Sequence, residues 1–497
     1  MATEQEILAA RRARAEKLRD AGVELFPARV PRDRSAIPEV LARFGTADAD
    51  ALAQAAAVFC IAGRIVALRS FGKMAFATLQ GDGERLQVWL KQDLLGGAFE
   101  SVRLYEVGDF IWARGPLVRT RKGELTIEAR EQGFLAKSYR PLPEKFHGLQ
   151  DVEARYRQRY LDVLTNPESR QIFVTRSRMI SAMRGFLDER GFLEVETPIL
   201  QPLYGGANAR PFTTIHNTYD QMLYLRISFE LYLKRLVIGG LDRVYEIGRD
   251  FRNEGVSKKH NPEFAMLEVY QAYADFEDMM ALTEQLVAHA AERTLGTTVI
   301  ERDGRQLELA PPWPRRKMAE LIHAACGIDI GRATELGALQ AAVKQANLPD
   351  VDATGATSWA GLVDTIFSEI VEPALFTPTF VVEYPAALSP LAKREPGRPQ
   401  MVERFEAFMG GMEICNAFSE LNDPDEQRQR FLDQAEAARR GDTEAQPLDE
   451  DFLRALEHGM PPTGGLGLGV GRLAMMLTGA SHLREVKLFP HMRTRDA

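Results

Sequence analysis

The stretch GRDFRNEGVSKKHNPEFAMLEVYQ, residues 248–271, decides the fold because it encodes a long hairpin with one unusual face. In its second arm, a period of two places Leu267 and Val269 on a core face. The opposite face is a mixed set of side chains: Phe264, Met266, Glu268 and Tyr270. The first arm carries Asp250 and Arg252 on one face. A solvent-exposed antiparallel sheet also explains a polar face, so the hairpin alone leaves both interpretations open.

A second hairpin is predicted in FEAFMGGMEICNAFSEL, residues 405–421. If Gly410 and Gly411 form a two-residue turn, Glu406 pairs with Cys415 and lies diagonally across from Glu413 on the same face. Proteins commonly hold Mg²⁺ with one or two carboxylates plus substrate phosphates, so this pair points to a nucleotide. Two solvated glutamates are the alternative.

Three further candidate site residues follow on the same strand. Asn416, Phe418 and Glu420 share a face by period two, but their parity is opposite to that of Glu413. Either the two sets serve different faces, or a bulge near Cys415 brings them to one face.

The stretch PPTGGLGLGVGRLAMML, residues 461–477, combines alternate glycines with a helix that is expected to begin near Arg472. Alternate glycines remove the side chains from one strand face, so a ligand can lie against the backbone. An arginine at a helix N-terminus favours phosphate there. Tight packing between strands is the other interpretation. Neither a Walker loop nor a dinucleotide-binding glycine motif after a strand is found, so the usual Rossmann sites are excluded.

The first 145 residues read as a separate module. A basic helix is expected over 4–21 and an Ala-rich helical segment over 49–57. Five short strand-like segments then follow, over 58–70, 73–80, 85–90, 107–119 and 123–129. Five strands in so short a span predict a small β-barrel of the OB type, which often binds oligonucleotides, and this front has a slight excess of basic residues. The Pro-rich linker over 137–151 marks its end.

The second half alternates long helices with strands, which predicts an α+β fold. Helices are expected over 172–187, 276–294 and 315–346, and strands over 376–385 and 405–421. The predicted domains are a helical extension (1–57), the barrel (58–145) and a catalytic domain (146–497). Three scattered cysteines without a CxxC pair argue against a zinc site or disulfide framework and favour a reducing, cytoplasmic compartment. No signal peptide and no membrane-spanning run are expected.

These segments carry a family resemblance. The stretches FLEVETPIL, FRNEGVSKKHNPEF and GLGLGVGR resemble the three motifs of class II aminoacyl-tRNA synthetases. RISFELYLKRLVIGG and GGMEICNAFSELND resemble the bacterial lysyl-tRNA synthetase branch. The resemblance runs from about residue 58 to residue 490. It implies an OB-fold anticodon-binding domain before a class II catalytic domain with a mixed, mostly antiparallel sheet, and a homodimer whose interface includes residues 172–200.

The resemblance also implies roles for individual residues. Arg252 and Arg472 are the catalytic arginines, on the α-phosphate and γ-phosphate of ATP, and Arg252 also meets the substrate carboxylate. The other implied ATP-binding residues are Glu254, His260 and Phe264, with Phe264 stacked on adenine. The implied Mg²⁺ ligands are Glu406 and Glu413. The implied lysine-binding residues are Gly206, Glu230, Arg252, Glu268, Tyr270, Asn416, Phe418 and Glu420. The implied anticodon-binding residues are Phe76, Gln87 and Arg69.

The function implied is that of a lysine–tRNA ligase, with ATP, L-lysine and tRNA(Lys) as substrates. An acidic pocket of Glu230, Glu268 and Glu420 suits a cationic side chain, and buried polar sites reject analogues that leave them unpaired. Two alternatives remain: a paralogue that lysylates a translation factor, whose relatives lack the barrel, and an inactive tRNA-binding protein. One position departs from the family pattern, because Gly471 stands where an acidic residue usually precedes the motif 3 arginine.

Overall fold

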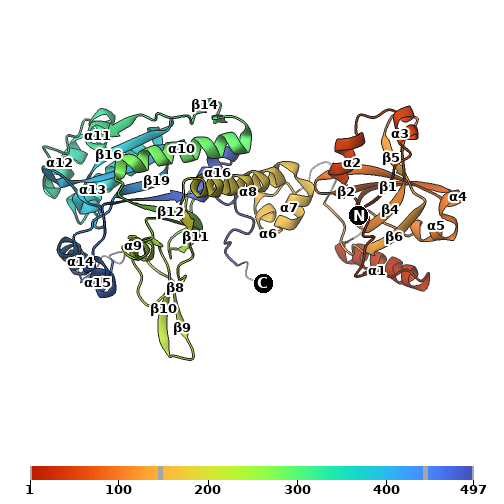
Figure 1. Ribbon diagram of the computed structural model, residues 1–497, viewed down its shortest axis with the longest axis horizontal. Coiled ribbons are helices and arrows are strands. Elements are labelled where there is room, and N and C mark those ends of the chain that lie inside the picture. The colour runs from red at the N-terminus through yellow and green to blue at the C-terminus, as the bar shows by residue number, and fades with distance from the viewer. Residues whose placement is uncertain (1–2, 144–148, 440–445, 495–497) are drawn as a thin grey trace. The chain divides into compact units, whose positions relative to one another are not determined.

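The computed structural model describes residues 3–143, 149–439 and 446–494. The chain forms two compact units, Met1–Pro167 and Glu168–Ala497 (Figure 1). No helix among the described residues is long and apolar enough to cross a membrane.

The first unit is built on a six-stranded barrel with strand order β1-β2-β3-β5-β4-β6, closed by pairing of β1 with β4. Its elements are α1 (Glu4–Asp20), α2 (Ile37–Phe44), α3 (Ala49–Ala55), β1 (Val58–Phe71), β2 (Met74–Gly81), β3 (Glu84–Lys91), α4 (Gln92–Leu95), α5 (Phe99–Val102), β4 (Phe110–Arg119), β5 (Leu125–Glu128), β6 (Glu131–Ala136), α6 (Val152–Arg157) and α7 (Arg159–Thr165). The OB fold is therefore confirmed. Strand β6 was not predicted, because only Phe134 of its residues is buried and no apolar alternation marks it.

The second unit is built on a sheet with strand order β15-β16-β18-β19-β20-β12-β11-β7. Only the terminal pairs β15–β16 and β11–β7 are parallel, so the predicted mixed, mostly antiparallel sheet is confirmed. Its strands are β7 (Leu193–Glu194), β11 (Arg243–Phe251), β12 (Glu263–Ala272), β15 (Arg315–Lys317), β16 (Thr379–Pro385), β17 (Arg394–Glu395), β18 (Arg398–Met409), β19 (Met412–Ser419) and β20 (Thr463–Gly469). Separate small sheets are formed by β8 (Leu200–Gln201), β9 (Thr213–His216) and β10 (Gln221–Leu225), and by β13 (Val299–Arg302) and β14 (Arg305–Glu308).

Helices cover both faces of this sheet (Figure 1). Its helices are α8 (Pro167–Asp188), α9 (Glu230–Ile238), α10 (Phe276–Leu295), α11 (Met318–Cys326), α12 (Leu336–Gln345), α13 (Trp359–Ile366), α14 (Pro424–Arg439), α15 (Glu450–Glu457) and α16 (Val470–Thr478). Helices α8, α10 and α16 pack on the face that carries Leu267 and Val269, and they form the largest core. Helices α9, α14 and α15 pack on the face that carries Tyr270.

One predicted helix is wrong. The span 315–346 is not a single helix, because strand β15 occupies its start and α11 ends before Gly327. Gly327 adopts a left-handed φ of 75° and caps α11, a conformation that stops a helix and that glycine adopts without a steric penalty.

The opening hairpin forms as its alternation indicates. Strands β11 and β12 pair antiparallel with Glu246 opposite Glu268 and Asp250 opposite Phe264. The mixed set is thereby fixed on one face, while Leu267 and Val269 are fully buried on the other. The polar loop between the strands, which carries Lys259 and His260, is held above the mixed face.

The second hairpin corrects one predicted register. Gly410 and Gly411 both have positive φ and turn the chain so that Phe408 pairs with Glu413, as expected. The register then shifts, and Glu406 pairs with Asn416 rather than with Cys415. A bulge at Ile414 inserts this extra residue, which brings Glu413 to the same face as Asn416, Phe418 and Glu420. Of the two alternatives that the sequence leaves open, the bulge is the one that occurs.

Candidate active site

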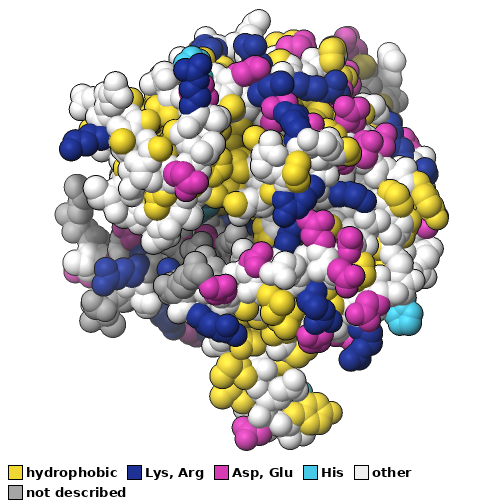
Figure 2. Space-filling view, turned by 90° about the vertical axis from the view of Figure 1, so that its left-hand side faces the viewer, with side chains coloured by type: hydrophobic (Ala, Val, Ile, Leu, Met, Phe, Trp, Pro, Cys, Tyr) yellow, Lys and Arg dark blue, Asp and Glu magenta, His cyan; other side chains and the backbone are white. Residues whose placement is uncertain are grey.

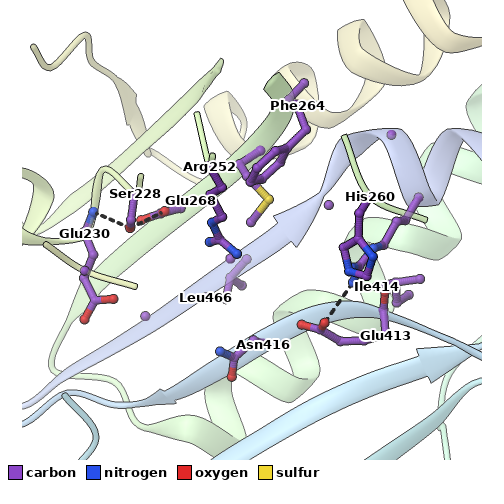
Figure 3. A pocket seen from close by; sticks show the side chains of 18 of the residues that line it. Ser228, Glu230, Arg252, His260, Phe264, Glu268, Glu413, Ile414, Asn416 and Leu466 are labelled. Atoms are coloured by element: carbon purple, nitrogen blue, oxygen red, sulfur yellow. Dashed lines mark hydrogen bonds and ion pairs between the residues drawn. The ribbon is translucent and has the colours of Figure 1, made fainter. Parts of the chain in front are cut away.

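One cavity on the mixed face of the sheet gathers most of the predicted site residues (Figure 3). The hairpin β11–β12, strand β19, strand β20 and the start of α9 supply its walls. The predicted residues that line it are Gly206, Glu230, Arg252, Glu254, His260, Phe264, Glu268, Tyr270, Glu413, Asn416, Phe418, Glu420 and Arg472. Glu406 does not line the cavity.

Cationic side chains dominate one end of the cavity. The guanidinium of Arg252 lies 5.1 Å from the ring centroid of Phe264, so a positive charge stands beside an aromatic face. Arg472, at the start of α16, donates to Oε2 and to the backbone oxygen of Glu413, at 2.8 Å each. His260 lies 3.2 Å from Arg472. Burial and the nearby positive charges of Arg472 and Lys259 lower the pKa of His260 to about 4, so its ring is neutral at pH 7. This end of the cavity suits phosphate groups.

The anchoring of Arg472 comes from Glu413 and not from residue 471. A Cβ atom at Gly471 would lie 2.6 Å from Cδ1 of Leu483, so Leu483 leaves little room for a side chain at this position. Arg472 is held instead by the two hydrogen bonds that it donates to Glu413.

Glu413 lies close enough to Glu406 to influence it electrostatically. Burial raises the pKa of Glu406 to about 7 even though Arg404 opposes the shift, and the charge of Glu413 adds to the increase. Glu406 accepts hydrogen bonds from Arg404 at 2.5 Å and from Tyr384 at 2.9 Å. The pKa of Glu413 is lowered, because Arg472 outweighs the effect of burial. No cluster of three or more metal-ligating side chains occurs within residues 3–143, 149–439 and 446–494.

Buried carboxylates form the opposite end of the cavity. Glu230, Glu268 and Glu420 are 6%, 5% and 1% exposed. Glu268 accepts hydrogen bonds from Ser228 at 2.8 Å and from Tyr270 at 3.1 Å, and burial together with the charge of Glu230 raises its pKa to about 7. Burial also raises the pKa of Glu420 well above its ordinary value. Oε2 of Glu420 forms an ion pair with the ammonium of Lys234, whereas no hydrogen-bond donor among the described residues reaches Oε1. A buried acceptor without a donor suits a cationic ligand.

Glycines make room for these carboxylates. A Cβ atom at Gly465 would lie 1.9 Å from Oε1 of Glu420 and 2.7 Å from a ring carbon of Tyr270. At Gly206 it would lie 2.9 Å from Oγ of Ser228 and 3.0 Å from Cβ of Glu230, and the φ of 87° there also requires glycine. Gly465 of strand β20 and Gly206 therefore leave the space that the acidic side chains occupy.

Several residues that support the site were not predicted. Lys234 is fully buried and forms ion pairs with Glu230, at 2.6 Å, and with Glu420. Ser228 holds Glu268, while Arg404 hydrogen-bonds Asn416 at 3.0 Å as well as Glu406. A sequence signal existed for Lys234, because its four-residue spacing from Glu230 places both on one helix face.

The predicted anticodon residues lie on one face of the barrel. Arg69 is exposed and pairs across the strands with Phe76, whose ring stacks on Trp89 at 5.2 Å between centroids and 19° between planes. The ammonium of Lys91 lies 3.4 Å from the Trp89 ring centroid. Gln87 is only 4% exposed, and its amide is held by Glu124 and Thr126. Trp89 and Lys91 were not predicted.

Comparison with known proteins places both units among described families. Residues 151–493 match the family described as tRNA synthetases class II (D, K and N), and residues 59–131 match the OB-fold nucleic acid binding domain. Curated relatives with the name lysine–tRNA ligase include those of Chloroflexus aurantiacus, at 52% identity over 99% of both chains, and Moorella thermoacetica, at 48% over 99% of both. A third, from Pelotomaculum thermopropionicum, is 49% identical over 99% of this chain and 96% of its own.

Proposed function

The chain belongs to the class II tRNA synthetases (D, K and N), and from this membership we propose that it is a lysine–tRNA ligase. It is an aminoacyl-tRNA ligase by family, and the proposal concerns its amino acid. The observation that carries the choice of lysine is the charge of the cavity: cationic at the end of Arg252 and Arg472, and acidic at the end of Glu230, Glu268 and Glu420. The phosphates of a nucleotide fit the cationic end, and the cationic side chain of an amino acid fits the acidic end.

The reaction then follows from this placement. One oxygen of the lysine carboxylate attacks the α-phosphorus of ATP, the bond to the bridging oxygen breaks, and lysyl-adenylate and pyrophosphate form. Arg252 holds the carboxylate and the α-phosphate, Phe264 stacks on adenine, and Arg472 holds the γ-phosphate, with Glu254 and His260 along the nucleotide. This is catalysis by positioning and charge neutralisation. The 3′-OH of the terminal ribose of tRNA(Lys) then displaces AMP.

The residues present also fit a Mg²⁺ ion. The charge of Glu413 raises the pKa of Glu406, so the two carboxylates lie near each other, and Mg²⁺ takes one or two carboxylates plus phosphate oxygens. When bound, the ion neutralises phosphate charge. Arg472 now occupies Oε2 of Glu413, so Glu413 would be available to the ion, and the guanidinium to phosphate, only if this contact were exchanged.

At the other end, Glu230 binds the α-ammonium of lysine and Glu420 with Tyr270 binds the ε-ammonium. Gly206, Glu268, Asn416 and Phe418 complete this pocket. Support comes from Oε1 of Glu420, which is buried and has no hydrogen-bond donor among the described residues, and from the place of Glu420 in the same cavity as Arg252.

We assign residues 1–57 to a helical extension, 58–145 to an anticodon-binding domain and 146–497 to the catalytic domain, in keeping with the matched ranges 59–131 and 151–493. A cytoplasmic location is part of the same proposal, because tRNA charging takes place where translation does.

Pyrophosphate exchange with each amino acid in turn tests the proposal. Lysine is expected to support ATP–pyrophosphate exchange and to be transferred to tRNA(Lys). Exchange without tRNA charging would indicate a protein-modifying paralogue. Absence of exchange with every amino acid would indicate an inactive binding protein.

Phe76→Ala is expected to weaken tRNA charging while adenylate formation stays unchanged. Stacking of a base on an aromatic ring contributes about 1–3 kcal/mol, so kcat/KM for tRNA should fall by about 5-fold to 150-fold. Aminoacylation kinetics against tRNA concentration measure the effect, with pyrophosphate exchange as the internal control. Phe26→Ala, at an exposed aromatic outside strands β1–β3, is the matched control. Unaltered charging by Phe76→Ala would refute the anticodon role.

We also propose that the protein is a homodimer whose interface includes residues 172–200. The exposed apolar side chains in and beside this span support it: Leu193, Ile199 and Leu200, with Ile215, Tyr219 and Met222 on the neighbouring β9–β10 ribbon. This ribbon projects at the bottom of Figure 2 with hydrophobic side chains on its surface. Exposed apolar groups so close together indicate a protein contact. Light scattering should give twice the chain mass, and a monomer at micromolar concentration would contradict the proposal.

A further inference from the structure

The proposed lysine pocket already contains an ammonium group. Lys234, on α9, is fully buried behind the cavity and does not line it. Its Nζ atom forms an ion pair with Oε1 of Glu230 at 2.6 Å and a second ion pair with Oε2 of Glu420. It therefore joins the two carboxylates that are proposed to bind the α-ammonium and the ε-ammonium of the substrate.

The number of charges in the pocket explains why an ammonium group is placed there. Glu230, Glu268 and Glu420 carry three negative charges when ionised, and Lys234 cancels one of them. Two charges remain, and the α-ammonium and ε-ammonium of lysine supply two positive charges. The substrate carboxylate is left to Arg252 at the other end of the cavity. Because buried charge without a partner is costly, a neutral pocket is strongly favoured over one with excess charge of either sign.

We propose that Lys234 is a fixed counter-ion of the lysine pocket, an inference that rests on the proposed function. The single positive charge of Lys234 makes the three carboxylates complementary to a substrate with two ammonium groups. Lys234 acts through Glu230 and Glu420 and is a positioning residue. An amino acid with one ammonium group leaves one buried carboxylate uncompensated and is rejected for that reason.

The surroundings of Lys234 agree with a permanent positive charge. Burial alone would lower the pKa of Lys234, but the carboxylates of Glu230 and Glu420 outweigh burial and raise it. The rings of Phe418 and Phe452 lie 5.7 and 5.9 Å from Nζ and close the site to water.

Other titratable groups also face the pocket carboxylates. From β12 these are Glu268 and Tyr270, and from β18 it is Arg404, which influences Glu230. In the substrate-free protein burial raises the pKa values of Glu230 and Glu420, and it raises that of Glu268 to about 7, so Glu268 is partly protonated near pH 7. Lysine binding then requires proton release.

The variant Lys234→Met tests the proposal, because it keeps the length of the side chain and removes its charge. We expect KM for lysine in pyrophosphate exchange to rise about 100-fold or more, with KM for ATP within about 2-fold of wild type. The acidic limb of kcat/KM for lysine against pH should move to higher pH by about one unit or more, since loss of an opposite charge raises carboxylate pKa values. Lys234→Arg, which keeps the positive charge, should keep the acidic limb of kcat/KM for lysine at the wild-type pH.

A double variant separates charge balance from simple packing. Glu268→Gln removes one negative charge without touching Lys234, so Lys234→Met with Glu268→Gln restores a pocket of charge minus two. The double variant should bind lysine about 10-fold or more better than either single variant. Val237→Ala, a buried change on the same helix, should lower the melting temperature without moving the pH profile.

The outcomes are distinct. A wild-type pH profile in Lys234→Met, or losses in the double variant equal to the sum of the two single losses, would overturn the counter-ion. If Lys234→Met does not fold, two other measurements test the proposal. One is the pH profile of Lys234→Arg, and the other is calorimetry of lysine binding to the wild type in two buffers, which measures proton release. Binding without proton release near pH 6, or a shifted limb in Lys234→Arg, would also overturn it. Failure of the wild type to exchange with lysine would instead refute the proposed function.

Discussion

The Arg252→Ala variant is expected to lose at least about 10³-fold in the rate of lysine-dependent pyrophosphate exchange. The side chain lies at the cationic end of the cavity, beside Phe264, where the carboxylate of lysine and the α-phosphate of ATP are proposed to meet. Two negatively charged groups come together there, so loss of the guanidinium removes the charge that allows their approach. Single-turnover formation of adenylate from labelled ATP measures the effect directly.

Two further variants make this result specific. Arg249→Ala removes an arginine of strand β11, three residues before Arg252, whose side chain is 55% exposed and paired with Glu263 at the surface. It should leave exchange close to wild type. Arg252→Lys keeps the charge but loses the paired donors and should recover only part of the rate. Circular dichroism and melting should show all three variants folded. Exchange by Arg252→Ala within about tenfold of wild type would remove Arg252 from the reaction centre.

Alternation was sufficient to predict which residues face the site on the opening hairpin. The period of two in 263–272 depends only on strand geometry, and the sheet pairs accordingly. Parity alone could not assign Glu413 and Glu420 to one face, since this depends on the bulge at Ile414, whose extra residue has no signature in the local sequence. The same limit explains the Glu406 register, which was wrong by one residue.

The residues behind the cavity were harder to predict than those lining it. The family resemblance implies roles only for side chains that contact substrate. Lys234, Arg404 and Ser228 instead form hydrogen bonds or ion pairs with other side chains of the protein. Their partners come from different elements, so the contacts depend on tertiary packing. Gly471 shows the converse: it departs from the family pattern beside Arg472, but Arg472 is anchored by Glu413, 59 residues away in the sequence.

Separation of charge along one cavity links these features. The cationic end suits phosphate because Arg252 and Arg472 line it, while His260 is neutral at pH 7. At the acidic end, Gly465 of β20 leaves room for Glu420 and Tyr270, which another side chain there would block. The proposed orientation of the substrate therefore follows from the charges of the two ends.

Glu420→Gln is expected to lower kcat/KM for lysine by about 10³-fold while KM for ATP stays within about 2-fold of wild type. The substitution keeps the shape of the side chain and removes the charge that the ε-ammonium of lysine is proposed to meet. Loss of one partner of a buried ion pair costs about 3–5 kcal/mol, which corresponds to roughly 10² to 10³·⁵ in affinity. Pyrophosphate exchange at varied lysine and at varied ATP separates the two constants.

The structure makes this prediction stricter than a loss of activity. Within the protein, the amide of Glu420→Gln loses the ion pair of Oε2 with Lys234, while the ion pair of Lys234 with Glu230 remains. The melting temperature is therefore expected to fall, and circular dichroism at the assay temperature should show the variant folded. Glu457→Gln, the same chemical change on an exposed side chain of α15, should leave all constants unaltered. A wild-type KM for lysine in Glu420→Gln would show that the acidic end of the cavity does not hold the substrate side chain, and lysine specificity would then have to come from the tRNA alone.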